Sequence, residues 1–150
     1  MKIRAALPAD TEQLAEMWFA LWPHGTLESH RDDIGRIFAG TFSTLPMTQL
    51  VAENGDGRLV GFVDVGLRSH ADACDPRRPA GFIEGWFVAP EFRRTGIGAA
   101  LVRAAEEWAR EQGCVEMASD ALIDNVTSHL AHAALGYQIV ERAVHFRKQL

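Results

Sequence analysis

Residues Gly81 to Gly98 read Gly-Phe-Ile-Glu-Gly-Trp-Phe-Val-Ala-Pro-Glu-Phe-Arg-Arg-Thr-Gly-Ile-Gly. The first half is rich in aromatic and β-branched residues, which is typical of a buried strand, and Ala89-Pro90 ends it because proline cannot donate to a ladder. Two arginines and two glycines then precede a strong helix-forming segment that begins at Ala99. Because glycine lets the backbone approach an anion and the first N–H groups of a helix are unpaired, this loop is predicted to hold a phosphate.

Two common phosphate-binding motifs do not match this loop. A P-loop requires a lysine and a hydroxyl residue directly after its last glycine, and neither follows Gly98. The dinucleotide fingerprint requires a third glycine or alanine where this chain has Leu101. The motif alone also leaves open an ordinary strand-to-helix turn whose glycines serve only tightness.

Length and composition predict one globular domain over residues 1–150. The chain is 47% hydrophobic and 23% charged, and no run approaches the roughly 18 apolar residues of a membrane span. The start lacks the apolar core of a signal peptide, so we expect a cytoplasmic protein with no membrane partner. A net charge of −5 argues against nucleic acid as the main partner and suits a cationic one. The two cysteines, Cys74 and Cys114, form no motif for a disulfide framework or a zinc site.

Hydrophobic periodicity and turn residues predict the order β-α-α-β-β-β-α-β-α-β-β, an α/β sandwich of one mixed sheet with helices on both faces. Asp10 is expected to cap the first helix, which Pro23 ends, and Ser29 is expected to start the second. A hairpin turn at 54–57 joins two antiparallel strands. The remaining expected elements are a long loop at 68–80, the central strand before Ala89, a helix over 98–112, a strand over 115–119, a helix over 124–135, and final strands over 137–140 and 143–147.

Two carboxylates lie where an amine could be deprotonated. Glu84 interrupts the apolar central strand, and a carboxylate there is costly unless it is paired or faces a cleft. Asp120 ends the next strand, at the edge where open α/β sheets bind ligands. Asp64 lies within an apolar strand, with a solvent-facing position and a cleft position equally open. His129 and His132 could be a metal pair, but no acidic or cysteine partner accompanies them at ligand spacing, so no metal is expected.

The Arg-x-x-Gly-x-Gly loop after Val-Ala-Pro resembles the acetyl-CoA loop of the GCN5-related N-acetyltransferases (GNAT). The resemblance implies the GNAT fold and acetyl-CoA as co-substrate. The coenzyme-binding residues that it implies are Phe87, Val88, Arg93, Arg94, Thr95, Gly96, Ile97, Gly98, Ala99, Asn125 and His132. It places His132 where the family usually has a tyrosine that protonates the leaving thiolate, a role that histidine can also fill. A side chain at position 98 is expected to occupy the pyrophosphate position.

Residues Phe82 to Val88, together with Ser119-Asp120-Ala121 and Asp124-Asn125, look like the aminoglycoside 6'-N-acetyltransferases, a branch of this family. The resemblance implies that Asp120 contacts the amino groups of the drug and that Glu84 lies at the acceptor amine. Trp22 and Asp64 are then expected to line the drug cleft. The segment Ser69 to Pro79 departs from the branch, and this departure bears on which drugs are accepted.

The function expected from these resemblances is transfer of an acetyl group from acetyl-CoA to an aminoglycoside by direct attack in a ternary complex, because neither cysteine matches a nucleophile motif. An acetyltransferase for another amine, such as a polyamine, an amino sugar or a peptide, is the alternative. A non-catalytic acyl-CoA sensor is a third possibility, which Glu84 and Asp120 disfavour. The family also implies a homodimer, and the apolar, strand-like 143–146 could pair across subunits.

Overall fold

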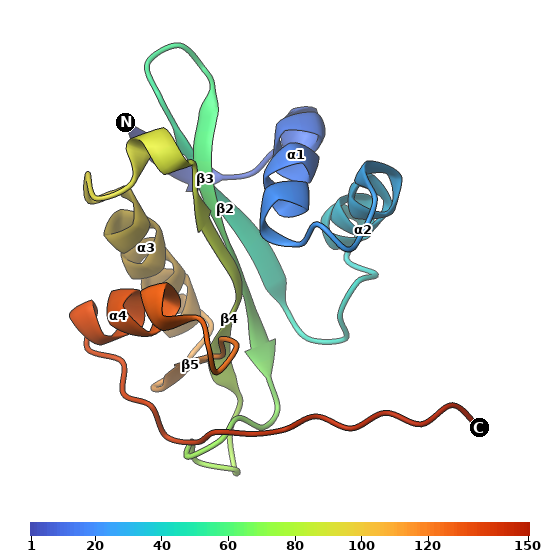
Figure 1. Ribbon diagram of the computed structural model, residues 1–150, viewed down its shortest axis with the longest axis vertical. Helices are drawn as coiled ribbons and strands as arrows, with labels where there is room; N and C mark the ends of the chain where they lie inside the picture. Colours follow the sequence, from blue (N-terminus) through green and yellow to red (C-terminus); the bar gives the residue numbers. More distant parts are fainter.

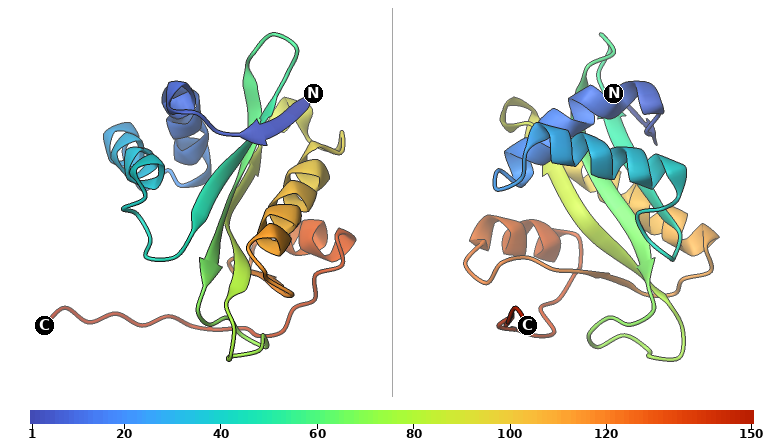
Figure 2. Two further views of the ribbon diagram at one scale, coloured as in Figure 1. Left: turned by 180° about the vertical axis from the view of Figure 1, so that it is seen from behind. Right: turned by 90° about the vertical axis from the view of Figure 1, so that its right-hand side faces the viewer.

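The computed structural model describes all residues from Met1 to Leu150. One five-stranded sheet carries α1 and α2 on one face and α3 and α4 on the other (Figure 1; Figure 2). The strands are β1 (Lys2–Ala5), β2 (Met47–Glu53), β3 (Leu59–Arg68), β4 (Ala80–Val88) and β5 (Met117–Ser119). The helices are α1 (Thr11–Leu21), α2 (Leu27–Ala39), α3 (Ile97–Glu111) and α4 (Val126–Ala134), and short 3-10 turns cover Pro8–Asp10 and Pro90–Phe92.

The strands lie in the order β1-β2-β3-β4-β5. Successive pairs from β1 to β4 are antiparallel, and β5 is parallel to β4. The predicted mixed, mostly antiparallel sheet with helices on both faces is confirmed. No helix is long and apolar enough to cross a membrane.

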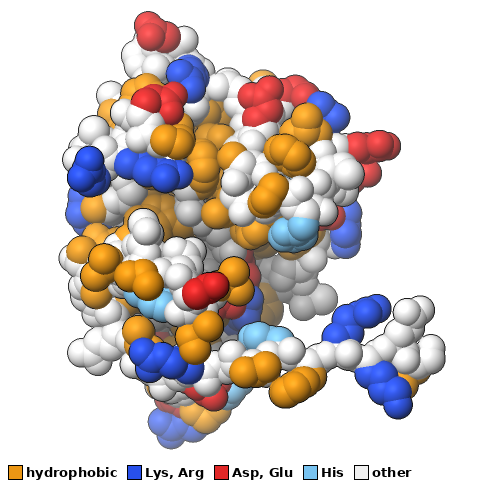
Figure 3. Space-filling view, in the orientation of Figure 1, with side chains coloured by type: hydrophobic (Ala, Val, Ile, Leu, Met, Phe, Trp, Pro, Cys, Tyr) orange, Lys and Arg blue, Asp and Glu red, His pale blue; other side chains and the backbone are white.

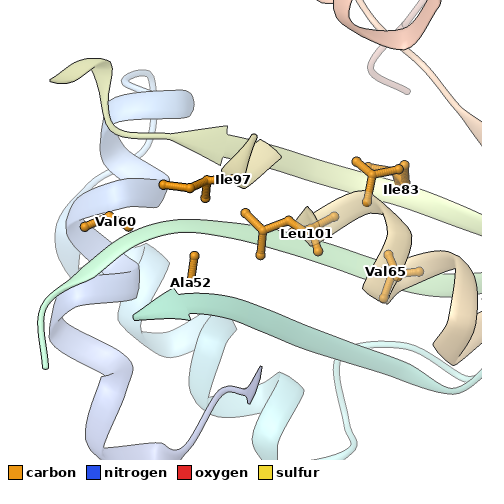
Figure 4. Close-up of a cluster of buried hydrophobic side chains, with 9 residues drawn as sticks. Ala52, Val60, Val65, Ile83, Ile97 and Leu101 are labelled. Atoms are coloured by element: carbon orange, nitrogen blue, oxygen red, sulfur yellow. The ribbon is translucent and has the colours of Figure 1, made fainter. Parts of the chain in front are cut away.

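Two apolar layers hold the helices to the sheet. Between α3 and the sheet, a cluster of nine buried residues includes Val65, Ile83 and Leu101 (Figure 4). Between α1, α2 and the sheet, a second cluster of eight includes Leu14 and Phe62. Both layers are built from the alternating inward positions of β2 to β4, so the sheet is covered on both sides through its centre.

A bulge interrupts the pairing of β3 with β4. Asp64 faces Gly85 and Val65 faces Ile83, so Glu84 is an extra residue without a cross-strand partner. A bulge of this kind bends a strand and re-aims a side chain. The side chain of Glu84 therefore does not follow the alternation of side-chain directions along β4.

The pairing of β4 with β5 is short. It covers only Gly81 to Ile83 on β4. From Glu84 to Val88 the edge of β4 that faces away from β3 has no partner strand. The sheet therefore opens beside the end of β4, just before the glycine-containing loop.

The two final strands expected over 137–140 and 143–147 are not formed. The chain after α4 runs along the lower end of the sheet and then away from the body without regular structure (Figure 1). Its apolar side chains have no core to enter, and Phe146 is 93% exposed. The segment has the composition of a strand but forms none, because it pairs with no neighbouring strand.

The expected helix starts also need correction. The side chain of Thr26, not Ser29, caps α2, and Ser29 completes the capping box by accepting from the Thr26 N–H at 3.0 Å. Asp10 makes no side-chain cap to α1. Its carboxylate instead accepts from the Leu7 N–H at 2.7 Å and pairs with Arg4 at 2.7 Å, which lowers the pKa of Asp10.

Candidate active site

The loop between β4 and α3 presents a row of unpaired backbone donors. None of the six N–H groups from Arg94 to Ala99 has an acceptor in the protein, and the first helical hydrogen bond is donated by Ala100 to the Gly96 carbonyl. Arg94 and Gly96 both have positive φ, 60° and 88°, a backbone shape that turns successive N–H groups toward one side. Together with the positive end of α3, this row forms a cradle for an anion and fits a pyrophosphate.

Side chains of the loop close the turn. The Arg93 Nε donates to the Val88 carbonyl at 2.8 Å, and the Thr95 hydroxyl donates to the Phe92 carbonyl at 2.6 Å. The Arg94 side chain is exposed and has no hydrogen-bond partner in the protein. It is therefore the charged side chain of the loop that remains available to an anion.

Gly98 contributes its N–H to the cradle and also has a packing role. A Cβ on Gly98 would lie 3.0 Å from Cζ2 of Trp86, tighter than ordinary packing. The first carbon of a side chain at position 98 would therefore meet the indole, so this glycine also serves the close approach of α3 to β4. At Gly96, by contrast, nothing lies within 4 Å of the Cβ position.

Glu84, at the bulge, is held by a residue that sequence reasoning missed. Its Oε1 accepts from the Arg68 Nε at 2.8 Å and its Oε2 from the Arg68 Nη2 at 2.7 Å, a bidentate pair. The guanidinium also lies 3.5 Å from the centre of the Phe82 ring. Arg68 ends β3 opposite Ala80, and its side chain extends along β4 over the Phe82 ring to reach Glu84, 16 residues away in the sequence.

Asp120 follows β5 and is exposed. No hydrogen bond or ion pair within the protein involves its carboxylate. Arg68 is near enough for Asp120 to contribute to raising its pKa, after the larger effect of Glu84. The two predicted carboxylates thus both act on one guanidinium, Glu84 through direct hydrogen bonds and Asp120 through its charge.

A cavity of about 1110 Å³ adjoins this group. It lies between β5, the loop at 70–74 and the chain after α4, and its lining includes Arg68, Asp120 and His132. Glu84, Trp22 and the anion cradle do not line it. In the space-filling view, the C-terminal segment extends away from the lower part of the body and carries hydrophobic and basic side chains (Figure 3).

Trp22 lies where the sequence placed it, at the end of α1, and it contacts the central strand. A Cβ on Gly85 would overlap Cη2 of Trp22, so the indole rests against the backbone next to Glu84. Trp18 supports it edge-on, with ring centres 5.0 Å apart. His30 is buried, and its Nε2 donates to the Trp22 carbonyl at 3.1 Å. This hydrogen bond fixes the end of α1.

Asp64 does not lie on an open cleft wall, contrary to expectation. It is 1% exposed, its Oδ1 accepts from Gln49 Nε2 at 2.9 Å, and its Oδ2 has no partner. Burial raises the pKa of Asp64 to about 8, and the negative charge of Glu84 adds to the rise. Asp64 is a buried residue beneath Trp22 and Gly85, without a free face for a substrate.

His132 on α4 belongs to a hydrogen-bonded group with Ser119, a second residue that sequence reasoning missed. Its Nδ1 lies 2.8 Å from the Ser128 carbonyl, which can only accept, so Nδ1 carries a hydrogen. Its Nε2 lies 2.8 Å from the Ser119 hydroxyl at the end of β5. The ring packs edge-on against Trp86 and Tyr137, with ring centres 5.4 and 5.7 Å away.

The remaining predicted coenzyme residues have structural contacts. Asn125 Oδ1 accepts from the Ser128 N–H at 3.1 Å and so caps α4. Phe87 stacks on Phe62, with ring centres 6.1 Å apart, on the α1 side of the sheet. Phe87 and Val88 both lie on the unpaired stretch of β4. No cluster of three or more His, Cys, Asp or Glu side chains is arranged to hold a metal ion.

Comparison with known proteins gives consistent matches over nearly the whole chain. The family model "Acetyltransferase (GNAT) family" matches residues 11–137. An aminoglycoside N(6')-acetyltransferase type 1 from Klebsiella aerogenes is 39% identical over 99% of this chain and 96% of its own length.

Solved structures agree. The apo crystal structure of the aminoglycoside 6'-N-acetyltransferase AAC(6')-IG from Acinetobacter haemolyticus has a TM-score of 0.88 at 33% identity, covering 100% of this chain and 99% of that one. The enzyme AAC(6')-Iy, in complex with the bisubstrate analogue CoA-S-monomethyl-acetylneamine, has a TM-score of 0.87 at 32% identity, covering 99% and 98%.

Proposed function

The chain belongs to the acetyltransferase (GNAT) family, and from this premise we propose that it transfers the acetyl group of acetyl-CoA to the 6'-amine of aminoglycoside antibiotics. The observation that carries the proposal is the arrangement of β4, which has a glutamate at its bulge and leads directly into a cradle of six unpaired N–H groups. One strand thus serves both an anionic coenzyme and a cationic acceptor. Relatives named for this reaction match the chain from end to end.

At the coenzyme end, the backbone from Arg94 to Ala99 would hold the pyrophosphate and the Arg94 side chain would add charge. The unpaired edge of β4 at Phe87 and Val88 would run beside the rest of the coenzyme, as a strand would. Arg93 acts by closing the turn through the Val88 carbonyl. When bound, acetyl-CoA supplies the thioester whose carbonyl carbon is attacked.

At the acceptor end, Trp22, Glu84 and Asp120 would receive the amine. An ammonium group has to lose a proton before its nitrogen can attack. We assign that proton to Asp120, directly or through a water, because Asp120 has no ion-pair partner whereas Glu84 is already paired with Arg68. The C–N bond then forms and the C–S bond breaks, so the sulfur requires a proton in turn.

His132 would supply the proton for the sulfur, with Ser119 as its contact. In the neutral ring Nδ1–H is donated to the Ser128 carbonyl, so Nε2 accepts from the Ser119 hydroxyl. Only the protonated ring can give up a proton at Nε2, and the Ser119 hydroxyl lies directly on that path. Asn125 would act by fixing the start of α4, the helix that carries His132. Asp64, being buried, is left out of the acceptor site.

A panel of amines tests the proposal. Acetyl-CoA consumption should be rapid with kanamycin and tobramycin, with the product acetylated at the 6' nitrogen by mass spectrometry and NMR. Acetylation of spermidine, glucosamine or a peptide without acetylation of kanamycin would refute the assigned substrate and keep the enzyme class. Coenzyme binding without turnover on any amine would identify a sensor.

We also infer a homodimer in the cytoplasm. The apolar residues of the C-terminal segment, with Val144 77% and Phe146 93% exposed, need cover, and β5 is paired on one side only. The free thiols of Cys74 and Cys114 suit a reducing compartment. Light scattering at monomer mass over micromolar concentrations would refute the dimer, and recovery of the protein in a membrane or secreted fraction would refute the location.

A further inference from the structure

A cation already lies at the acceptor end of the site. The Arg68 guanidinium is bound to both oxygens of Glu84, and it is near enough to Asp120 for the charge of that carboxylate to help raise its pKa. These are the two carboxylates proposed to receive the ammonium groups of the substrate. Arg68 could therefore either keep the acceptor amine away from Glu84 or fix the Glu84 carboxylate in position for that amine.

The geometry favours holding. Two short charge-assisted bonds fix the guanidinium at one edge, and the ring of Phe82 lies flat against it at 3.5 Å from the centroid. Arg68 keeps its charge at all working pH, since the bonds to Glu84 raise its pKa further. The Glu84 carboxylate and the Phe82 ring thus hold the guanidinium at its edge and at its face.

Glu84 needs such a support. As the extra residue of the bulge it has no cross-strand neighbour to fix the direction of its side chain. A carboxylate offers about four lone-pair sites, and the bidentate pair takes two of them. Glu84 can thus bind Arg68 and still accept from an ammonium group or a water.

We propose that Arg68 is a positioning residue that fixes the Glu84 carboxylate for the acceptor amine. The inference rests on the proposed function, because it assigns Arg68 a task in the binding of that acceptor. The planar fork is essential to it, since the one-point charge of a lysine cannot set the orientation of a carboxylate.

The test compares Arg68→Ala and Arg68→Lys with the same changes at Arg36. Arg36 is a matched control because it too pairs with a carboxylate, Asp33 at 3.4 Å, and lies over a phenylalanine, Phe42 at 5.4 Å, but on the far end of α2. We expect Arg68→Ala to lower kcat/KM for kanamycin about ten- to a hundredfold, mainly through KM, with the KM for acetyl-CoA unchanged. Arg68→Lys should not restore the loss, and millimolar methylguanidinium should restore part of it in Arg68→Ala alone.

A double-mutant cycle isolates the route of action. If Arg68 acts through Glu84, adding Arg68→Ala to Glu84→Ala should cause little further loss. An equal loss in both backgrounds, full rescue by lysine, or an Arg68→Ala enzyme as active as Arg36→Ala would each overturn the inference. Calorimetry with acetyl-CoA shows that each variant is folded. A wild-type enzyme that acetylates some other amine refutes the aminoglycoside assignment, and the same cycle on that amine still decides the role of Arg68.

Discussion

The indole of Trp22 rests directly on Gly85, the residue that follows the bulge of β4. A methyl group at Gly85 would overlap the ring, and Trp18 packs edge-on against the ring. The end of α1 and the acceptor end of β4 are therefore fixed to each other through one contact. This contact sets the wall of the site beside Glu84.

Gly85→Ala should push Trp22 out of place. We expect a loss of about 1–3 kcal/mol in the free energy of unfolding from overpacking, and about a tenfold loss in kcat/KM for kanamycin with acetyl-CoA affinity unchanged. Gly66→Ala is the control, because a Cβ there would be 3.5 Å from Met47 Cγ, an ordinary contact in the same sheet. Chemical denaturation and steady-state kinetics measure both. Equal behaviour of the two variants would contradict the assigned contact.

Gly96→Asp and Gly96→Asn form a matched pair at the anion cradle. Both side chains tolerate positive φ and both find open space at a position where φ is 88°. Only aspartate adds a negative charge beside the unpaired N–H groups, so it should weaken acetyl-CoA binding at least tenfold more than asparagine does. Isothermal calorimetry gives the two affinities. If the two variants bind the coenzyme alike, the cradle does not hold its pyrophosphate.

Asp64→Asn should change how stability depends on pH. The pKa of Asp64 is raised by burial to about 8 from 3.8, so folding takes up a proton between these values. The contribution of this group to stability is complete below about pH 4 and is lost, at about 1.4 kcal/mol per pH unit, as the pH rises toward 8. The neutral variant escapes this loss. Its advantage over the wild type in urea unfolding should grow from pH 5 to pH 8, whereas the exposed Asp56→Asn should show none.

His132→Gln should lower kcat about a hundredfold or more, without a change in either KM, if His132 protonates the sulfur. Ser119→Ala should lower kcat as well, because the hydroxyl lies on Nε2. His129→Gln is the control on the same helix, since the His129 ring makes one hydrogen bond, to the Leu122 carbonyl at 2.9 Å, and none to His132 or Ser119. Unchanged kcat in His132→Gln would remove α4 from the chemistry.

Asp120→Asn keeps the shape of the side chain and removes its charge. We expect a ten- to hundredfold loss in kcat/KM for kanamycin from the lost charge-assisted contact, and a further fall in kcat if Asp120 accepts the proton. Asp124, an exposed carboxylate four residues away, provides the control as Asp124→Asn. Kinetics over several ionic strengths separates the two effects, because salt screens the binding contribution. A kcat that falls equally in both variants would count against Asp120.

The central fold could be predicted from local signals. The turn at Asn54 to Gly57 and the alternation on either side predicted the β2–β3 hairpin, and proline and glycine marked the end of β4 and the start of α3. These signals work because each element there agrees with its neighbours. The predicted start of α2 at Ser29 was wrong because Ser29 is the second residue of the capping box, whose N-cap is Thr26, three residues earlier.

The sequence could not predict which side chains from distant segments contact each other. Arg68 and Ser119 attract no notice alone, and only the pairing of β3, β4 and β5 brings them to Glu84 and His132. The sequence left open whether Asp64 faces solvent or a cleft, and it could not show that Asp64 is buried, because Trp22 approaches from another element. The segment after α4 has strand-forming residues but pairs with no strand of the sheet, although one edge of β5 is free.

The extra residue in β4 also determines which face of the sheet each later residue of the strand points to. Upstream of it Ile83 serves the α3 layer, and downstream Trp86 serves that same layer, three positions later instead of two or four. Inserting or deleting one residue between them would exchange the layers that all following side chains serve, moving the Trp86 ring toward α1 and Phe87 toward α3. We therefore expect β4 to tolerate a change of side chain more readily than a change of length. The face of the sheet to which each residue points is as necessary for activity as any single carboxylate.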